Sequence, residues 1–518
     1  MKNNNQIFAN NIIDKLLFSL GLSLIFFINI RAQNEATIVL DSTHQIIRGF
    51  GAANILPWRP DMTNDEINTA FGTGDGQIGF SILRLRVPNQ PSEFNLNIPT
   101  AQAAHSLGVT LIASPWSPPP AMKTNNDPVG GELDEAHYDD FAAHLDSFAT
   151  YMAKNDAPIY AISVQNEPDV NVTYESCDYN ASQMLKFVKE NGQSIGTKIM
   201  APESAHFDKL LSDPILNDSA ACASLDIVVG HIYGGGLEPY PLAESMGKEI
   251  WMTEHLQLGT SWADALSTAN DINDCLRSGM NAYIWWYIVR FYGPIGDGEI
   301  PDYPKGEVTK RGYAMSQFSR FIRPGYWRIE STGNPQDSIF TSAYIDSLSS
   351  KVVIVAINDS SQALEQTFTF QNGNIEKFTP YVTSQTKNCS QENDILVSNA
   401  GFSTSLDAQS VTTFVSSGNV IVSVEHSLSH PTSFKLYQNY PNPFNPSTRI
   451  NFEIPEKSFV SLQVYNILGE EVAELAGKEY IAGVHSLTFN ASHLASGIYF
   501  YTLRAGDFTQ TRKMFLIR

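Results

Sequence analysis

The sequence contains few cysteines and few basic residues. The 518 residues include four cysteines. There are 33 Lys and Arg residues and 54 Asp and Glu residues, which gives a formal net charge of -21. A surface of this sign repels phosphate backbones and anionic lipid head groups, so we expect no nucleic-acid partner. A hydrophobic content of 42% excludes a disordered chain, because it is enough to build more than one buried core.

Motifs for cofactors are also missing. No Gly-rich phosphate loop follows the first predicted strand, and none of the cysteines has metal-ligand spacing, so we expect no metal and no organic cofactor. In an oxidising compartment the cysteines could form up to two disulfides, with three possible pairings. They are Cys177, Cys222, Cys275 and Cys389.

Long apolar runs are confined to the N-terminus. Lys2 and Lys15 precede the run "LLFSLGLSLIFFINI", which is followed by Ala32. This order predicts a secretory signal peptide over residues 1–32, with cleavage near Ala32 and Gln33. A membrane anchor is the alternative, although a run of about 15 residues is short for a bilayer span. No later segment is apolar enough to cross a membrane, so we expect no transmembrane span in the mature form.

Beyond the signal, short apolar runs alternate with amphipathic segments. Near-continuous apolar strands separated by helices are typical of a parallel sheet covered on both faces, and eight such units fit a (β/α)8 TIM barrel. An open doubly wound α/β sheet is the alternative. The predicted strands lie at 46–54, 80–87, 110–116, 159–168, 198–204, 225–233, 249–255 and 281–290, and helical patterns include 138–155, 181–195 and 262–279.

Two of these strands end in a glutamate. Glu167 closes the fourth run, in "AISVQNEPDV", and Glu254 closes the seventh, in "WMTEH". The carboxyl ends of barrel strands form the active face, so both side chains can point to one central cleft. Such a pair suits glycoside hydrolysis, in which one carboxyl group donates a proton to the leaving oxygen and the other attacks the sugar carbon. For either glutamate alone, a salt-bridged strand end is the simpler interpretation.

Aromatic side chains at other strand ends are candidates for stacking on sugar rings, whose C–H faces are apolar. Trp285 and Trp286 cannot both point into the barrel, because neighbours along a strand face opposite ways, and we favour Trp286. Some of the others are expected in the core. The set is Trp58, Trp116, Tyr233, Trp285, Trp286, Tyr287 and Tyr292.

After residue 326 the pattern changes to short alternating strands such as "KVVIVAIND", which predict an antiparallel β-sandwich packed against the barrel. The polar segment 417–434 predicts a linker. Residues 435–518 again show strand alternation, without a carboxylate pair, which predicts a small β-sandwich without chemistry of its own. A carbohydrate-binding module is the alternative there, but its exposed aromatic platform is not evident.

The quoted runs carry a family resemblance. "IIRGFGAAN", "FSILRLRV", "ASPWSPP", "YAISVQNEPD", "WMTE", "WWYIVRFYGP" and "KRGYAMSQFSRFIRPGY" together resemble glycoside hydrolase family 30, in its glucuronoxylanase subfamily. The resemblance runs from about residue 35 to 416. It implies a barrel at 46–324 and a β-sandwich side domain built from 33–45 and 325–416.

The resemblance also implies an activity, the retaining hydrolysis of internal β-1,4-xylosidic bonds in xylan. Glu167 matches the acid/base of the family and Glu254 its nucleophile. Asn166 matches the residue that bonds the 2-hydroxyl of the sugar at the cleaved bond. We expect the enzyme to act as a monomer. A non-catalytic polysaccharide-binding protein is the alternative from another class, and the presence of both glutamates disfavours it.

The resembled subfamily cuts xylan near methylglucuronic acid side groups, which it binds from the loop after the eighth strand. Arg290 and Tyr292, in "VRFYG", match the binding positions, and a guanidinium can make a forked pair with a carboxylate. The alternative is that Arg290 holds its own loop through Asp297.

Two departures from the family pattern lie beside this pocket. The segment 255–266 is short and keeps only Ser261 of the groups that usually surround the acid, and residues 295–309 form an acidic insertion. Either change could loosen the dependence on glucuronate. A xylanase of broader or chain-end specificity is therefore the closest rival.

The C-terminal region resembles the sorting domain of the type IX secretion system, through "YPNPFNP", "YNILGEEV" and "GIYFYTL". This resemblance implies that the type IX machinery exports the protein across the outer membrane and that the domain is then removed. The enzyme would act at the cell surface or after release.

Overall fold

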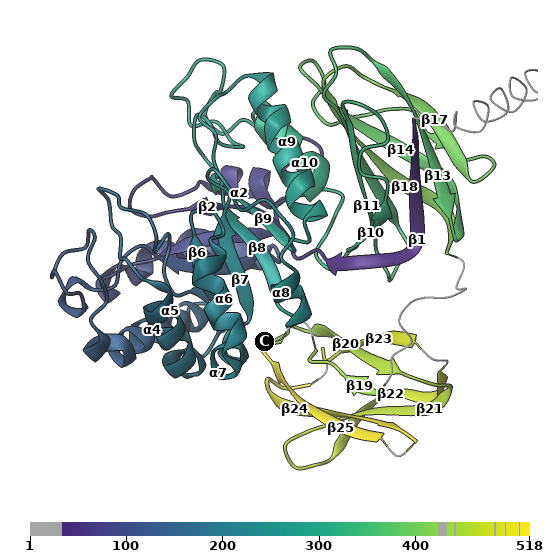
Figure 1. Cartoon of the computed structure of the whole chain (residues 1–518). Helices are drawn as coiled ribbons and strands as arrows, with labels where there is room; N and C mark the ends of the chain where they lie inside the picture. Colours follow the sequence, from purple (N-terminus) through teal and green to yellow (C-terminus); the bar gives the residue numbers. More distant parts are fainter. Residues whose placement is uncertain are drawn as a thin grey trace, which may run out of the picture. The chain divides into compact units, whose positions relative to one another are not determined.

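The computed structural model describes residues 34–422, 433–439, 442–480, 483–492, 494–506 and 508–517. The predicted signal peptide and most of the predicted linker lie outside the described residues. The chain divides into two compact units, Met1–Ser423 and Val424–Arg518 (Figure 1).

Eight parallel strands close into a barrel in the first unit (Figure 1). Each predicted apolar run supplies one strand, in chain order, so the predicted (β/α)8 barrel is confirmed. The strands are β2 (Gly49–Asn54), β3 (Ile82–Val87), β4 (Thr110–Pro115), β5 (Ile159–Ser163), β6 (Lys198–Ser204), β7 (Ile227–His231), β8 (Glu249–Glu254) and β9 (Ala282–Tyr287).

Helices cover the outside of the barrel, and capping boxes start three of them. The side chains of Thr63, Asn180 and Ser261 each accept a hydrogen bond from the third residue of their helix, which satisfies an amide that the helix leaves unpaired. No helix among the described residues combines the length and apolar character that a bilayer span requires. The helices are α2 (Asn64–Phe71), α3 (Ile98–Ser106), α4 (Tyr138–Lys154), α5 (Ala181–Asn191), α6 (Lys209–Asn217), α7 (Ser219–Ser224), α8 (Pro241–Ser245), α9 (Trp262–Arg277) and α10 (Lys310–Ser319), with short 3-10 turns at Pro91–Asn97, Pro120–Met122, Glu135–His137 and Gly192–Ser194.

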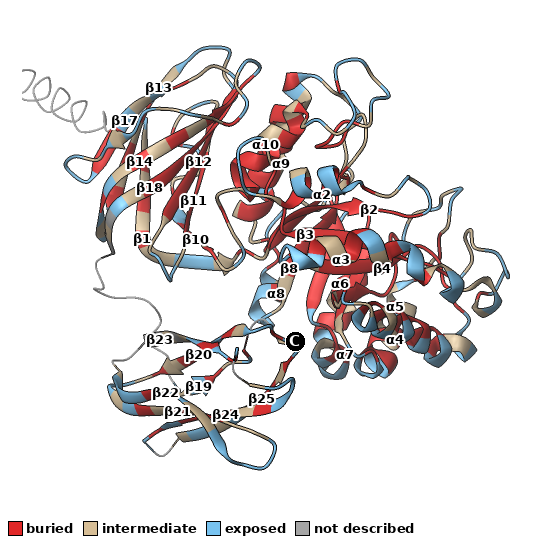
Figure 2. Ribbon diagram, turned by 180° about the vertical axis from the view of Figure 1, so that it is seen from behind, coloured by how far each residue is buried: buried red, intermediate tan, exposed pale blue. Residues whose placement is uncertain are grey.

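An apolar layer fills the lower part of the barrel. Ile82, Trp251 and Ile284 belong to this buried cluster, and Figure 2 shows the barrel strands as almost entirely buried. Side chains two residues further along a strand face the same way, which places Arg84 and Trp286 above the apolar layer. The barrel is thus closed below and carries polar and aromatic groups towards its carboxyl end.

A second group of strands forms the side domain. The N-terminal strand β1 pairs antiparallel with β10 and parallel with β13, so the chain starts in this domain and returns to it after the barrel. The ten strands form one sheet that encloses its own core, and this confirms the predicted β-sandwich. They are β1 (Glu35–Ile46), β10 (Trp327–Ser331), β11 (Ile339–Ile345), β12 (Val352–Asn358), β13 (Leu364–Gln371), β14 (Gly373–Thr383), β15 (Ser390–Gln391), β16 (Ile395–Leu396), β17 (Gly401–Leu406) and β18 (Ser410–Val422).

The side domain packs on α9 and α10 (Figure 1). The indole nitrogen of Trp262 donates to the carbonyl of Gln409 at 2.8 Å, and the hydroxyl of Thr413 donates to the carbonyl of Gln317 at 2.6 Å. Strand β18 continues to Val422, beyond residue 417 where the sequence predicts a linker, because β14 pairs with it as far as that residue.

The second unit is all-β, as predicted. It contains a three-stranded sheet, ordered β19-β20-β23, and a four-stranded sheet, ordered β22-β21-β24-β25, around one apolar core that includes Phe452 and Tyr501. The strands are β19 (Lys435–Leu436), β20 (Ser447–Ile454), β21 (Ser458–Tyr465), β22 (Glu471–Tyr480), β23 (Gly483–Asn490), β24 (Gly497–Ala505) and β25 (Phe508–Leu516).

The cysteines do not pair. All four lie in the described part of the first unit and all are free, so the disulfides that the sequence allowed are not formed. Cys177 and Cys275 are fully buried apolar side chains, and burial raises the pKa of the Cys177 thiol to about 12. These thiols therefore serve packing and remain protonated.

Candidate active site

A cavity of about 700 Å³ opens among side chains from the carboxyl ends of the barrel strands. Seven of the side chains that the sequence predicted as candidates for the site line it together. They are Trp58, Trp116, Glu167, Tyr233, Glu254, Trp286 and Tyr287. Trp285 instead lies in the core between barrel and helices, with no exposed surface.

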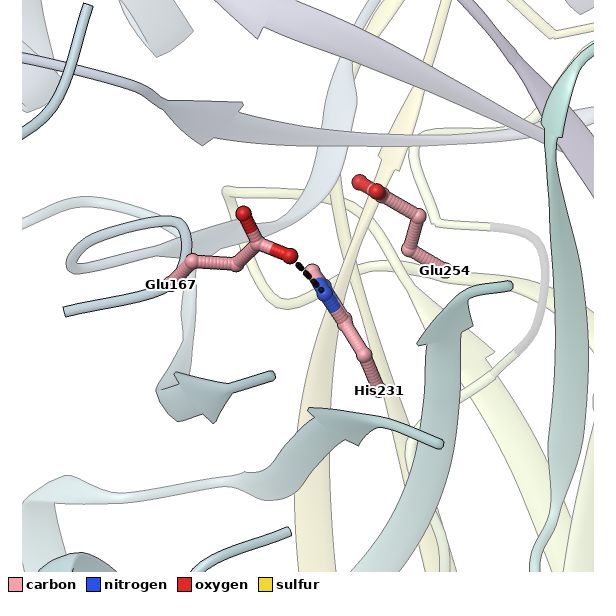
Figure 3. A group of neighbouring side chains, drawn as sticks. All are labelled: Glu167, His231 and Glu254. Carbon is pink, nitrogen blue, oxygen red and sulfur yellow. Dashed lines mark hydrogen bonds and ion pairs between the residues drawn. The ribbon is translucent and has the colours of Figure 1, made fainter. Parts of the chain in front are cut away.

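Glu167 and Glu254 approach each other across this cavity, with His231 between them (Figure 3). One ligand atom from each of the three side chains lies within 4.8 Å of the others. Nδ1 of His231 is 3.1 Å from Oε1 of Glu167. Glu167 has a φ of 46°, a region that residues with side chains rarely adopt and that is frequent at functional sites.

Arg84 donates hydrogen bonds to two buried carboxylates, those of Glu254 and Glu203. Its Nη1 lies 2.5 Å from Oε2 of Glu254, and its Nη2 lies 2.6 Å from Oδ1 of Asn166 and 3.1 Å from Oε1 of Glu203. Its Nε donates to the hydroxyl of Ser114 at 3.2 Å. The guanidinium is fully buried, so these fixed donors hold the base of the site in one geometry.

The buried charges shift one another's pKa values. Burial opposes the ionised form of Glu203, but Arg84 and His231 outweigh it and lower the pKa of Glu203 to about 2. Burial alone would lower the pKa of His231. The charges and hydrogen bonds of Glu254, Glu167 and Glu203 outweigh burial and raise this pKa to about 9. The unliganded site therefore holds a charged imidazole among three carboxyl groups.

The surroundings shift the pKa values of the two catalytic candidates in opposite directions. Burial raises the pKa of Glu254, and the charge of Glu167 adds to this effect, while His231 and Arg84 act against it. Burial also acts to raise the pKa of Glu167, but its hydrogen bond to His231 and the hydroxyl of Tyr174 keep it below the usual value. The raised pKa of His231 therefore makes its imidazolium the neighbour of Glu167 that can supply a proton.

Aromatic rings form one wall of the cavity. The rings of Trp58 and Trp116 are 5.4 Å apart, those of Trp116 and Trp286 are 5.6 Å apart, and those of Trp286 and Tyr287 are 4.6 Å apart. Trp58 is 37% exposed and lies at the open end, whereas Trp116 is buried. Adjacent rings whose exposure decreases from Trp58 to Trp116 suit the binding of sugar units, which stack on aromatic rings by their apolar faces.

The remaining predicted residues lie outside the cavity lining. Asn166 accepts the hydrogen bond from Arg84, and Tyr292 is buried with its ring against Phe291. Arg290 pairs with Asp297. The Ser261 hydroxyl donates to Oδ2 of Asp264 at 2.5 Å at the start of α9.

Sequence reasoning missed Arg84, Glu203 and His231. Each stands in a strand already recognised, in "FSILRLRV", "APES" and "GHIY". A charged side chain inside an apolar strand is the signal that could have revealed them, because such a residue has to find buried partners.

Glu167, His231 and Glu254 have the side-chain types of a metal site, and their ligand atoms lie within 4.8 Å of one another. The guanidinium of Arg84 already contacts Glu254 and adds a fixed positive charge to the cluster. This charge opposes a cation and favours a role for the carboxylates in proton transfer and attack.

Comparisons with known proteins identify relatives of this chain. The glucuronoxylanase XynC of Bacillus subtilis is 40% identical over 399 residues, which cover 74% of this chain and 92% of that protein. The structure of Xyn30A, a glycoside hydrolase family 30 subfamily 8 xylanase from Clostridium acetobutylicum, matches with a TM-score of 0.69 and 38% identity, over 74% of this chain and all of that one. A family 30 endoxylanase from Clostridium papyrosolvens matches with a TM-score of 0.68 and 36% identity over the same shares.

The barrel and its paired carboxylates, taken with these matches, define a glycoside hydrolase. The chain belongs to glycoside hydrolase family 30, together with the glucuronoxylanases. Residues 438–517 match the secretion system C-terminal sorting domain, so the second unit is a sorting domain rather than a carbohydrate-binding module.

Proposed function

We propose that this protein is a retaining endo-xylanase that cleaves internal β-1,4 bonds of glucuronoxylan. One observation carries the proposal: oxygens of Glu167 and Glu254 lie within 4.8 Å of each other in an aromatic-lined cavity. Carboxyl groups about 5 to 5.5 Å apart are typical of retaining enzymes, because no water fits between the attacking carboxylate and the sugar.

Glu254 is the nucleophile in this proposal. Arg84 and the hydroxyl of Tyr233, 2.9 Å from its Oε1, both donate to it and favour its ionised form. Its oxygen bonds to the anomeric carbon as the bond to the leaving oxygen breaks. Glu167 gives its proton to that oxygen, and in the second step it takes a proton from the water that releases the sugar.

The proton for the first step comes from the pair formed by Glu167 and His231. A proton on Nδ1 of His231 can cross the 3.1 Å contact to Oε1 of Glu167, which leaves a neutral imidazole and a carboxylic acid. A bound sugar removes water from Glu167 and thereby favours its uncharged form. His231 acts here as a positioning residue.

Arg290 and Tyr292 bind the methylglucuronic acid of the substrate in this proposal, as the resemblance implies, and Asn166 bonds a sugar 2-hydroxyl. The sorting domain supports export by the type IX secretion machinery to the cell surface or the medium, with xylan as the polymer met there.

The test is product analysis by mass spectrometry with the purified protein on glucuronoxylan and on undecorated linear xylan. We expect products with one methylglucuronic acid each, and proton NMR should show that the first product keeps the β configuration. Equal cutting of both polymers would replace the proposal by a xylanase of broader specificity. No cutting of either polymer would indicate a binding protein.

A further inference from the structure

The acidic insertion 295–309 contacts the loop after the first barrel strand. Strands β2 and β9 are neighbours in the barrel, so the loops that follow them meet at its carboxyl end. Arg59 comes from the first loop and Arg290 from the second, and both form ion pairs with Asp297 and Glu299 of the insertion. Four charged groups therefore lie together, and one of them, Arg59, directly follows the cavity-lining residue Trp58 in the sequence.

Asp297 is a fixed part of this cluster. Its Oδ2 accepts hydrogen bonds from Arg59 at 3.0 Å and from Arg290 at 2.9 Å, and its Oδ1 accepts the backbone N–H of Glu299 at 3.0 Å. The side chain is 6% exposed, so its removal would leave two guanidinium groups without a buried partner.

Glu299 is held differently. Its Oε1 lies 3.3 Å from Nη1 of Arg59 and contacts Nη1 of Arg290, but its side chain is 48% exposed. Water can therefore solvate this carboxylate as soon as it leaves the guanidinium, and the cost of its release is small.

The rest of the insertion is anchored elsewhere. The buried Tyr303 donates its hydroxyl hydrogen to the carbonyl of Thr260, in the short segment after β8, and the backbone N–H of Gly296 donates to the carbonyl of Glu307 at 2.9 Å. These contacts fix both ends of the turn that carries Glu299. A movement of its side chain requires no rearrangement of the loop.

Two guanidinium groups and two carboxylates cancel in charge, so the cluster offers little net attraction to an acidic sugar. We propose that Glu299 is an internal carboxylate ligand of Arg290 that the substrate's uronic acid has to displace. The inference rests on the proposed function, in which Arg290 binds that acid. Glu299 thereby lowers the advantage of acid-bearing chains and sets how strictly this enzyme depends on glucuronate.

The test compares Glu299→Gln with Glu307→Gln in the full chain. Glu307 lies in the same insertion and is exposed, and no ion pair to it is recorded in the described part of the chain, so its replacement removes the same charge without freeing Arg290. For E299Q we expect KM on glucuronoxylan to fall by about three- to tenfold, the effect of one partly exposed charged contact. The ratio of kcat/KM on glucuronoxylan to that on linear xylan should rise by a similar factor, and E307Q should match the unaltered protein.

A binding measurement separates recognition from turnover. Calorimetric titration of an aldouronic xylo-oligosaccharide into Glu254→Gln protein should show tighter binding when E299Q is added, and this gain should vanish when Arg290→Ala is added as well. An unchanged KM and unchanged affinity in E299Q, with weakened use of glucuronoxylan in R290A, would overturn the inference and leave the proposed function standing. An R290A protein that treats both polymers as before would overturn both.

Discussion

Nη1 of Arg84 lies 2.5 Å from Oε2 of Glu254, and the guanidinium is fully buried whereas the carboxylate lines the cavity. The other terminal nitrogen of Arg84 donates to Glu203 and Asn166, so one guanidinium positions the proposed nucleophile and its neighbours together. This contact should affect both the stability of the fold and the pH dependence of activity.

Replacement of Arg84 by Ala should destabilise the fold by about 3 to 5 kcal/mol, because it leaves buried carboxylates without their cation. The more conservative substitution Arg84→Lys keeps the positive charge but loses the planar, forked arrangement of hydrogen-bond donors. The hydrogen bond from Arg84 helps to lower the pKa of Glu254, and a lysine cannot reproduce its geometry, so R84K should move the acidic limb of kcat/KM to higher pH. Chemical unfolding and pH–rate profiles check both expectations, and an unshifted acidic limb in a folded R84K protein would contradict the second.

Glu254→Gln should abolish hydrolysis and keep substrate binding. Glu167→Gln should lower turnover of xylan by about 10² to 10⁴, the usual contribution of a general acid. With an aryl xyloside, whose leaving group needs no proton, the first step in E167Q should be much less affected and release of the sugar should become slow. Burst kinetics measure the difference, and near-normal turnover in E254Q would show that another residue attacks.

His231→Asn tests the shared proton. The unaltered pair retains its proton up to the raised pKa of His231, about 9, so the alkaline limb of kcat/KM should lie near that value. Without the imidazole, Glu167 holds the proton alone, with a pKa closer to that of an ordinary carboxyl group. The alkaline limb should therefore move to lower pH, and a limb that stays in place would mean that another group supplies the proton.

Stability should depend on pH in two opposite directions. The pKa of Glu203 falls from 4.5 to about 2 on folding, so its contribution is complete above pH 4.5 and is lost as the pH falls towards 2. The pKa of His231 rises from 6.5 to about 9, so its contribution is complete below pH 6.5 and is lost as the pH rises to 9. We expect the free energy of unfolding to be greatest between pH 4.5 and 6.5, as measured by urea titration. Folded H231N protein should lose the alkaline dependence, and an equally steep loss there would assign it to other groups.

The sequence was sufficient to predict the barrel and to place Glu167 and Glu254 at its carboxyl end, because apolar periodicity locates strands and a carboxylate at a strand end can be read from the sequence. It was not sufficient for the Arg84 cluster, since the partners come from β3, β6 and β8 and only closure of the barrel brings them together. The sequence allowed two roles for Arg290, binding of an acidic substrate group or an ion pair with Asp297. It could not decide between them, because the pairing with Asp297 depends on how a long insertion folds.

Strand β1 has a consequence for how the protein is made. It is synthesised before the other strands of the first unit, yet the backbone N–H of Thr37 donates to the hydroxyl of Thr332, 295 residues later. Strand β13, its parallel partner, is synthesised later still. The earliest strand of the side domain must therefore wait, unpaired, while the whole barrel is synthesised. A chain that stops before β10 would expose the apolar face of β1, so the core of the side domain can close only after β10 and β13 have been synthesised.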